Sequence, residues 1–230
     1  MKLRSVQETA KNNLRESLKK NNKVIVPAPT GFGKTILSKN IIESLVKNHK
    51  KVLFTVPRIK LAIQTLDKFG FGNLILGDKT KHNNSLLDIA SVQSLYSRRE
   101  NKNYDFIFID ECHYGHGSKW MNYIFETNSK AKIIGLSATP IDQNGYLLQG
   151  YDDIIEVGTV NDLVKLGWLT DVEVYSTPNQ PKTENLSVVN GDYNQTESSK
   201  LMRENNVLSN ALNEWQRLAK GKKTIVLYEK

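Results

Sequence analysis

Residues 28–35 read Ala-Pro-Thr-Gly-Phe-Gly-Lys-Thr, and this stretch decides the class of fold. It follows a short apolar segment at 23–27, which predicts a strand, and it opens a helix predicted over 34–48. Gly31 and Gly33 allow backbone conformations in which successive N–H groups face one anion. The N-terminus of the following helix adds partial positive charge at the same place. The pattern therefore predicts a phosphate-binding loop between a strand and a helix.

Two side chains at the end of this loop have the chemistry that a bound nucleoside triphosphate requires. Lys34 would place a full positive charge against the β- and γ-phosphates, and Thr35 would give a hydroxyl to Mg²⁺. Ala28 stands where the general pattern has Gly, and the alternative is a glycine-rich turn that only caps the helix. The residues expected to hold the nucleotide phosphates are Thr30, Gly31, Phe32, Gly33, Lys34 and Thr35.

The second informative stretch is Ile107-Phe108-Ile109-Asp110-Glu111, in which an apolar run leads directly into two acids. A carboxylate at the tip of a buried strand requires a neutralising partner, and Mg²⁺ can be that partner. We expect Asp110 to hold the metal, and Glu111 to orient the attacking water and accept its proton. In isolation the pair could be a solvated turn. Together with the phosphate loop it predicts a hydrolytic nucleotide site.

Strands and helices alternate along residues 1–178, which we interpret as one α/β domain. The expected sheet is mostly parallel with helices on both faces, so ligands should lie beyond the carboxyl ends of the strands. The predicted helices are 5–20, 34–48, 59–69, one that follows 115–118, and a short one at 162–167. The predicted strands are 23–27, 51–56, 73–76, 87–90, 104–110 and 131–136.

The composition changes after Pro178. Residues 179–220 begin with a polar stretch, predicted to be a loop through residue 200, and continue into an amphipathic connector helix at 201–219. Residues 221–230 include Lys223–Tyr228, an apolar run that predicts the first strand of a second domain. We expect the rest of that domain to be missing here. A chain that truly ended in this strand would leave the strand with an unpaired edge.

The totals favour an intracellular nucleic-acid partner. The 230 residues carry a formal net charge of +8, which favours a polyanion. Cys112 is the only cysteine in the sequence, so an internal disulfide is excluded and a reducing compartment is expected. We find neither a secretory signal nor an apolar run that could span a membrane, so we expect no membrane association and a cytoplasmic location. The abundance of Lys and Asn indicates a prokaryotic or viral protein from an AT-rich genome.

Asp110-Glu111-Cys112-His113 resembles the D-E-x-H box of superfamily 2 helicases, of the DEAD/DEAH-like kind. Ser137-Ala138-Thr139 follows a predicted strand and is similar to the S-A-T motif of that superfamily. The resemblance implies a RecA-like P-loop domain that uses ATP and Mg²⁺, the N-terminal one of two motor domains. It also implies that the nucleotide site is coupled to the nucleic acid and to the second domain through His113, Ser137 and Thr139.

Weaker motifs extend the resemblance. Gln7 matches the upstream glutamine that reads adenine, so we expect Gln7 and the nearby Arg4 at the base. Residues 55–58 and 89–95 resemble two segments that contact nucleic acid, and Gly77-Asp78 lies where the family has a loop that touches the backbone. An ordinary helix start or turn is the alternative for each. The implied nucleic-acid contacts are Pro57, Arg58, Gly77, Ser91 and Gln93.

These features predict an ATP-dependent helicase or translocase that contacts nucleic-acid phosphates with little sequence preference, DNA more than RNA. The family places its arginine fingers in the second motor domain, so we expect this chain, as a monomer, to bind ATP–Mg²⁺ but hydrolyse it weakly. Two alternatives remain: a nucleotide-switched nucleic-acid adaptor without motor activity, and a P-loop ATPase unrelated to nucleic acid. A zinc site at Cys112, His113 and His116 would lack a second ligand cluster.

Overall fold

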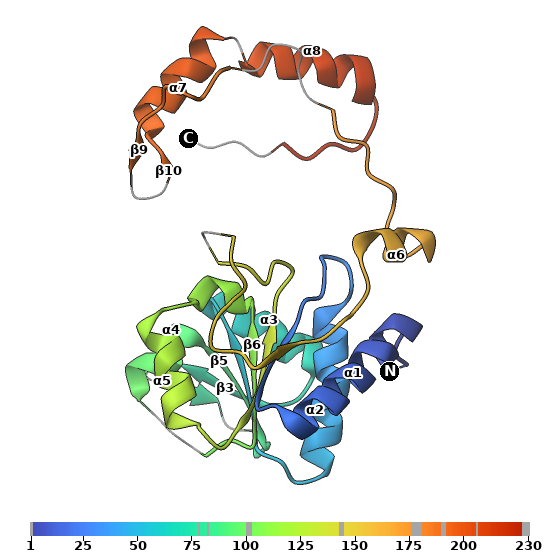
Figure 1. Ribbon diagram of the computed structural model, residues 1–230, viewed down its shortest axis with the longest axis vertical. Helices are drawn as coiled ribbons and strands as arrows, with labels where there is room; N and C mark the ends of the chain where they lie inside the picture. Colours follow the sequence, from blue (N-terminus) through green and yellow to red (C-terminus); the bar gives the residue numbers. More distant parts are fainter. Residues whose placement is uncertain are drawn as a thin grey trace. The chain divides into compact units, whose positions relative to one another are not determined.

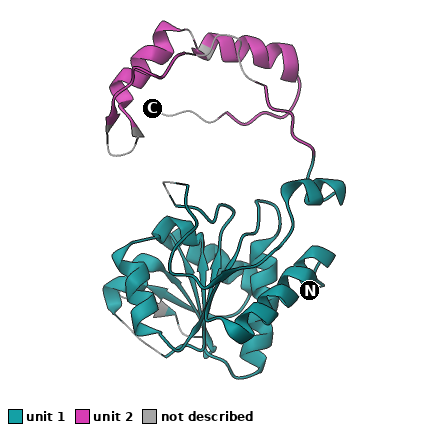
Figure 2. Cartoon of the chain, viewed as in Figure 1, with its two compact units in different colours: residues 1–170 teal, residues 171–230 magenta. Residues whose placement is uncertain are grey.

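The computed structural model describes residues 2–77, 79–81, 83–99, 103–142, 145–175, 181–189, 192–205 and 207–226. The chain forms two compact units, which are Met1–Thr170 and Asp171–Lys230 (Figure 2). The boundary between the two units lies after residue 170, eight residues before the domain boundary expected at 178. None of the helices in the described part of the chain is long and apolar enough to cross a bilayer.

The first unit contains an eight-stranded sheet with the strand order β4-β3-β5-β2-β6-β7-β1-β8. Every neighbouring pair is parallel except β3 and β4, which are antiparallel at one edge. The expectation of a mostly parallel sheet is therefore confirmed. The strands are β1 Lys23–Val26, β2 Val52–Val56, β3 Asn73–Leu76, β4 Lys79–Lys81, β5 Leu87–Ser91, β6 Phe106–Asp110, β7 Lys132–Leu136 and β8 Asp153–Ile154.

Helices cover both faces of this sheet, because successive strand residues point to opposite faces and both sets are apolar. One face packs against α1 (Ser5–Lys20), α2 (Lys34–Lys47) and α3 (Ile59–Phe69). The other packs against α4 (Val92–Arg98) and α5 (Lys119–Thr127), as Figure 1 shows. The two layers explain why the central strands read as continuous apolar runs.

Short elements account for most differences from the sequence-based prediction. The helix α4 and the strands β4 and β8 were not predicted, because each is too short to show a hydrophobic period. A 3-10 turn, η1 (Cys112–Gly115), follows β6, and the helix α6 (Val160–Lys165) begins two residues before the predicted helix at 162–167. The long helices and the central strands lie within a few residues of their predicted positions.

The second unit corrects two predictions. Part of the stretch predicted as a polar loop is helical, because the Asn194 side chain caps α7 (Gln195–Glu204) by accepting from two backbone N–H groups. The predicted helix at 201–219 is interrupted before α8 (Val207–Ala219). A short hairpin, β9 (Val188–Val189) and β10 (Asp192–Tyr193), precedes α7.

The strand predicted at Lys223–Tyr228 is not formed over residues 223–226. An apolar run becomes a strand only where a neighbouring strand accepts and donates its backbone hydrogen bonds. Within the described part of the chain, no strand pairs with these residues. The remainder of the predicted strand, 227–228, lies outside the described residues.

Candidate nucleotide site and nucleic-acid edge

The phosphate loop has the backbone form that its glycines predict. Gly31 and Gly33 have φ angles of 83° and 89°, in the left-handed region that glycine adopts without strain. Gly33 is the N-cap of α2, so the first N–H groups of that helix lie at the loop. The Phe32 side chain is fully buried in the core, which leaves only the backbone of this residue to face a ligand. Thr30 is exposed.

The phosphate loop and the acidic strand end meet in space. The Lys34 Nζ lies 3.4 Å from the Glu111 Oε1 and 3.5 Å from the backbone oxygen of Ala28. Glu111 itself has a φ of 50°, an uncommon conformation for a residue that is not glycine. This conformation turns the Glu111 carboxylate toward the phosphate loop, directly after the last residue of β6. The two stretches singled out in the sequence therefore form one site.

Asp110 is the last residue of β6 and is half-buried. Burial, the largest cause, and the adjacent Glu111 charge together raise the pKa of this carboxyl to about 6, although Lys34 opposes the shift. Lys34 does not fully offset this half-buried carboxylate and the acid beside it, and a bound divalent cation would complete the neutralisation. Thr35, half-buried in the first turn of α2, offers a hydroxyl on the same loop. The donor set fits Mg²⁺, which prefers oxygen ligands and keeps several waters.

A zinc site is not supported by the geometry. Among the residues whose positions are described, no three His, Cys, Asp or Glu side chains gather closely enough to hold a metal ion. Cys112 is fully buried, and burial raises the pKa of its thiol to about 12.

The predicted coupling residues contact one another. His113 Nδ1 lies 2.8 Å from the Ser137 Oγ and 3.5 Å from the Glu111 Oε2. The Ser137 Oγ also accepts from the Thr139 backbone N–H at 3.0 Å. Ser137 is fully buried, so the end of β7 is connected to the Glu111 carboxylate through the imidazole of His113. The three predicted coupling residues are therefore joined by direct contacts, and their role in coupling stays a prediction.

Gln7 packs under the phosphate loop. Its Oε1 accepts from the Arg4 backbone N–H at 3.0 Å, and its Nε2 donates to the backbone oxygen of Phe32 at 2.8 Å. Gln7 is 2% exposed, and its amide oxygen and nitrogen both form hydrogen bonds within the protein. One further N–H and one further lone pair remain for a base. The expected adenine contact therefore stays a prediction.

Trp168 and Leu169, which follow α6, lie against the candidate nucleotide site. The Arg4 guanidinium carbon lies 4.8 Å from the centre of the Trp168 ring, a cation–π distance. A Cβ at Gly31 would lie 2.4 Å from the Leu169 Cδ2, so Leu169 covers the phosphate loop. No motif marks this segment, and its position follows only from the path of the chain back toward α1.

The residues expected at nucleic acid gather at the ends of three neighbouring strands, β3, β5 and β2. The Gly77 N–H donates to the Ser94 Oγ at 3.0 Å, and the Ser91 Oγ donates to the same oxygen at 2.9 Å. Ser91 is fully buried and caps α4, so its hydroxyl is used inside the protein. Asp78 lies outside the described residues. The exposed members of the expected set are Arg58, at the N-cap of α3, Gly77 and Gln93.

The family model described as "Type III restriction enzyme, res subunit" matches residues 1–142. A curated relative, the "51.5 kDa protein" of Lactococcus phage (isolate 7-9), is 26% identical over 204 residues, which are 88% of this chain and 43% of the relative. The chain thus spans less than half the length of that relative.

Solved structures share the fold of the first unit. The Type ISP restriction-modification enzyme LlaGI, solved as a nuclease-deletion mutant with a DNA substrate mimic, has a TM-score of 0.60 at 22% identity, covering 73% of this chain and 21% of that one. The UvsW helicase from Bacteriophage T4 has a TM-score of 0.55 at 21% identity, over 67% of this chain and 60% of that one. The Hef helicase domain from Pyrococcus furiosus has a TM-score of 0.52 at 22% identity, over 66% of this chain and 37% of that one.

Proposed function

This chain belongs to the family of type III restriction enzyme res subunits, and from that premise we propose that it is an ATP-dependent motor domain of the helicase or translocase type that acts on DNA. The observation that carries the proposal is the approach of the Lys34 Nζ to the Glu111 Oε1 at 3.4 Å. This pair combines the charge that a γ-phosphate needs with the carboxylate that an attacking water needs. It lies at the carboxyl edge of a RecA-like sheet, where such folds bind ligands.

The residues of the site have distinct proposed roles in ATP hydrolysis. Lys34 and the N–H groups around Gly33 hold the β- and γ-phosphates, and Lys34 exchanges its contact with Glu111 for one with phosphate. Glu111 is then free to orient water and to accept its proton. His113 limits the positions that the Glu111 carboxylate can take. When bound, Mg²⁺ would neutralise charge on the phosphates, and Thr35 and Asp110 would hold it.

Nucleic acid is proposed to lie along the ends of β3, β5 and β2, next to the nucleotide site at β6, β7 and β1. Arg58 gives this edge an exposed cation, and Gly77 and Gln93 offer a backbone and an amide group. The likeness to a restriction-modification enzyme solved with a DNA mimic supports DNA as the substrate. Closure of this domain against a second RecA-like domain of a longer protein would couple ATP turnover to movement.

Filter binding over a salt series tests the proposal. Contacts to phosphates predict that the logarithm of the affinity for duplex or single-stranded DNA falls linearly with the logarithm of the salt concentration, with little sequence preference. An Arg58→Ala variant should lower both the affinity and the salt slope. A Lys60→Ala variant, which changes a neighbouring exposed cation in α3, is the matched control. Absence of DNA and RNA binding at low salt would support the ATPase unrelated to nucleic acid instead.

A further inference from the structure

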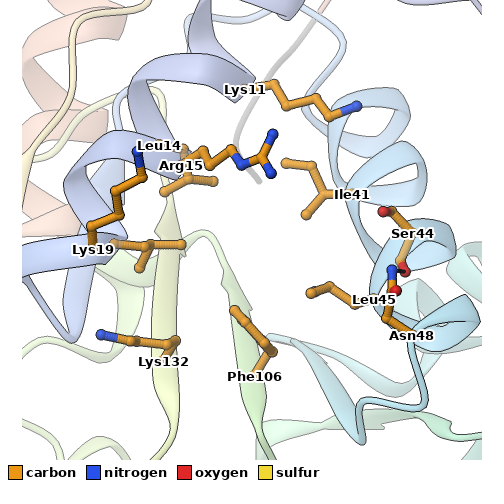
Figure 3. A pocket seen from close by; sticks show the side chains of 11 residues that line it. Lys11, Leu14, Arg15, Lys19, Ile41, Ser44, Leu45, Asn48, Phe106 and Lys132 are labelled. Carbon is orange, nitrogen blue, oxygen red and sulfur yellow. Dashed lines mark hydrogen bonds between the residues drawn. The ribbon is translucent and has the colours of Figure 1, made fainter.

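A cavity lies between α1 and α2, far along both helices from the candidate nucleotide site (Figure 3). Its volume is about 470 Å³, within the range of about 300–1,000 Å³ of ligand pockets. Phe106 and Lys132, the first residues of β6 and β7, lie at its base. Because these strands are parallel to β1, the cavity is at their amino ends and the phosphate loop is at the opposite edge of the sheet.

The floor of the cavity is apolar and follows the two helices. Leu14 and Leu18 lie one turn apart on α1, and Ile41 and Leu45 lie one turn apart on α2. Leu14 is buried, whereas Leu18, Ile41 and Leu45 are only partly covered. Phe106 completes the floor from the sheet. These side chains form an apolar strip two helical turns long, with α1 on one side and α2 on the other.

The rim of the cavity is basic. Lys11, Arg15 and Lys19 follow one another at four-residue intervals on α1, and Lys132 stands at the base (Figure 3). At 1.5 Å per residue, the row on α1 spans roughly 12 Å. None of the described residues that line the cavity is Asp or Glu.

Within the described part of the chain, two of these cations hydrogen bond to uncharged groups and a third has an exposed acidic partner. The Lys11 Nζ donates to the Asn40 Oδ1 at 2.8 Å, and the Lys132 Nζ donates to the Asn22 Oδ1 at 2.7 Å; both acceptors are uncharged. Lys19 pairs with Glu16 at 2.7 Å, but both side chains are more than half exposed, so water screens that pair strongly. The rim can therefore pair with acids from another molecule.

We propose that this α1–α2 groove is a docking site for an acidic amphipathic helix of a partner protein. A helix laid along the groove presents side chains at one-turn intervals, the same spacing as the cations on α1. Its acidic residues would meet Lys11, Arg15 and Lys19, and its apolar residues would cover the floor. The occupant would touch the two helices whose N-terminal ends carry Gln7 and Lys34.

Charge and apolarity together favour a helix over the other anions. A nucleic-acid backbone could pair with the cations, but its phosphates and sugars would not cover an aliphatic floor. A small amphipathic anion with one charged group would use one cation and leave the rest of the row without a partner. A segment with repeated acids beside repeated apolar side chains satisfies both features.

Fluorescence anisotropy with the full 230-residue chain tests the proposal. The probe is a labelled designed peptide of about 20 residues, long enough to be helical, with Leu on one face and Glu at one-turn intervals beside it. One control peptide replaces the Glu residues by Gln, and another replaces the Leu residues by Gln. The protein variants are Arg15→Glu with Lys19→Glu, and, as a matched control, Lys20→Glu, an exposed neighbour that does not line the groove.

We expect saturable binding of the acidic peptide, weaker binding of both control peptides, and a loss of at least about fivefold in the double variant. The Lys20→Glu variant should bind as the parent does. Unchanged affinity in the double variant, or no saturable binding, would overturn the proposal. It would also be overturned if a single-stranded oligonucleotide displaces the peptide and loses affinity for the double variant by the same factor, because the groove would then be a nucleic-acid surface.

Discussion

The Gln7 Nε2 donates a hydrogen bond to the backbone oxygen of Phe32 at 2.8 Å, which fixes the start of α1 to the phosphate loop. A Cβ at Gly33 would lie 2.6 Å from the same nitrogen, so the glycine is required by this contact as well as by its backbone conformation. A residue expected to read a base is therefore also part of the support under the phosphates. The two roles can be separated by experiment.

Replacing Gln7 by Met removes the hydrogen bonds and keeps the volume. We expect affinities for ATP and for inorganic tripolyphosphate to fall by the same factor, roughly threefold or more, because the loop loses its support. Isothermal titration calorimetry measures both, with Glu8→Gln, an exposed neighbour, as the control. If ATP binding alone weakens, Gln7 acts on the base and the support role is wrong.

Replacing Lys34 by Ala should weaken binding of a fluorescent ATP analogue by about 10- to 100-fold, because a charge-assisted hydrogen bond to phosphate is lost. Lys39→Ala is the matched control, since Lys39 lies on the same helix and its Nζ donates to the backbone oxygen of Lys68. Equal affinities of parent and Lys34→Ala would remove the basis for the nucleotide site.

Replacing Glu111 by Gln should leave ATP bound but slow its hydrolysis by about 10²- to 10⁴-fold, the usual contribution of a general base. Single-turnover hydrolysis, with the chain in excess over labelled ATP and with DNA present, measures the chemical step. Glu126→Gln, an exposed change on α5, is the control. Parent-like hydrolysis by Glu111→Gln would assign the base to another residue.

Replacing Asp110 by Asn should stabilise the metal-free protein near neutral pH. The folded pKa of about 6 lies above the ordinary value of 3.8, so the stability contributed by the protonated carboxyl is complete below about pH 4 and lost as the pH rises through 6. The shift of about 2 units corresponds to roughly 2–3 kcal/mol.

Urea unfolding in EDTA, repeated across this pH range, measures the effect. The gain of Asp110→Asn over the parent should grow between about pH 4 and pH 6 and then level off. Asp67→Asn, on the exposed side of α3, serves as the comparison and should show no such growth. A gain that is independent of pH would mean that the Asp110 carboxylate is not destabilised by burial.

Replacing Gly135 by Ala should destabilise the first unit by about 1–3 kcal/mol, because a Cβ there would lie 2.8 Å from the Tyr151 Oη and 2.9 Å from the Cys112 Sγ. The cost should be smaller when Cys112 is also replaced by Ala, since one of the two clashes is then removed. Denaturant unfolding of the four proteins in this cycle measures it. Parent-like stability of Gly135→Ala would show that the strand can shift without cost.

Local features were predictable because their signals are contained in short windows of the chain. The glycines at 31 and 33 dictate the loop, and the apolar run ending at Asp110 dictates a buried strand with an acid at its tip. The four-residue period of apolar residues predicted α1 and α2 nearly to their ends. Elements without a full period, such as α4 and β8, left no such signal.

Long-range placement could not be predicted, because it depends on strand order and register. The sequence alone determined a phosphate loop, an acidic strand end and an α/β chain built around them. Only the tertiary structure decided that Glu111 meets Lys34, that Ser91 is buried as the N-cap of α4, and that Leu169 covers Gly31. A sequence motif specifies which groups are available, whereas packing of the sheet and its helices specifies which of them reach each other.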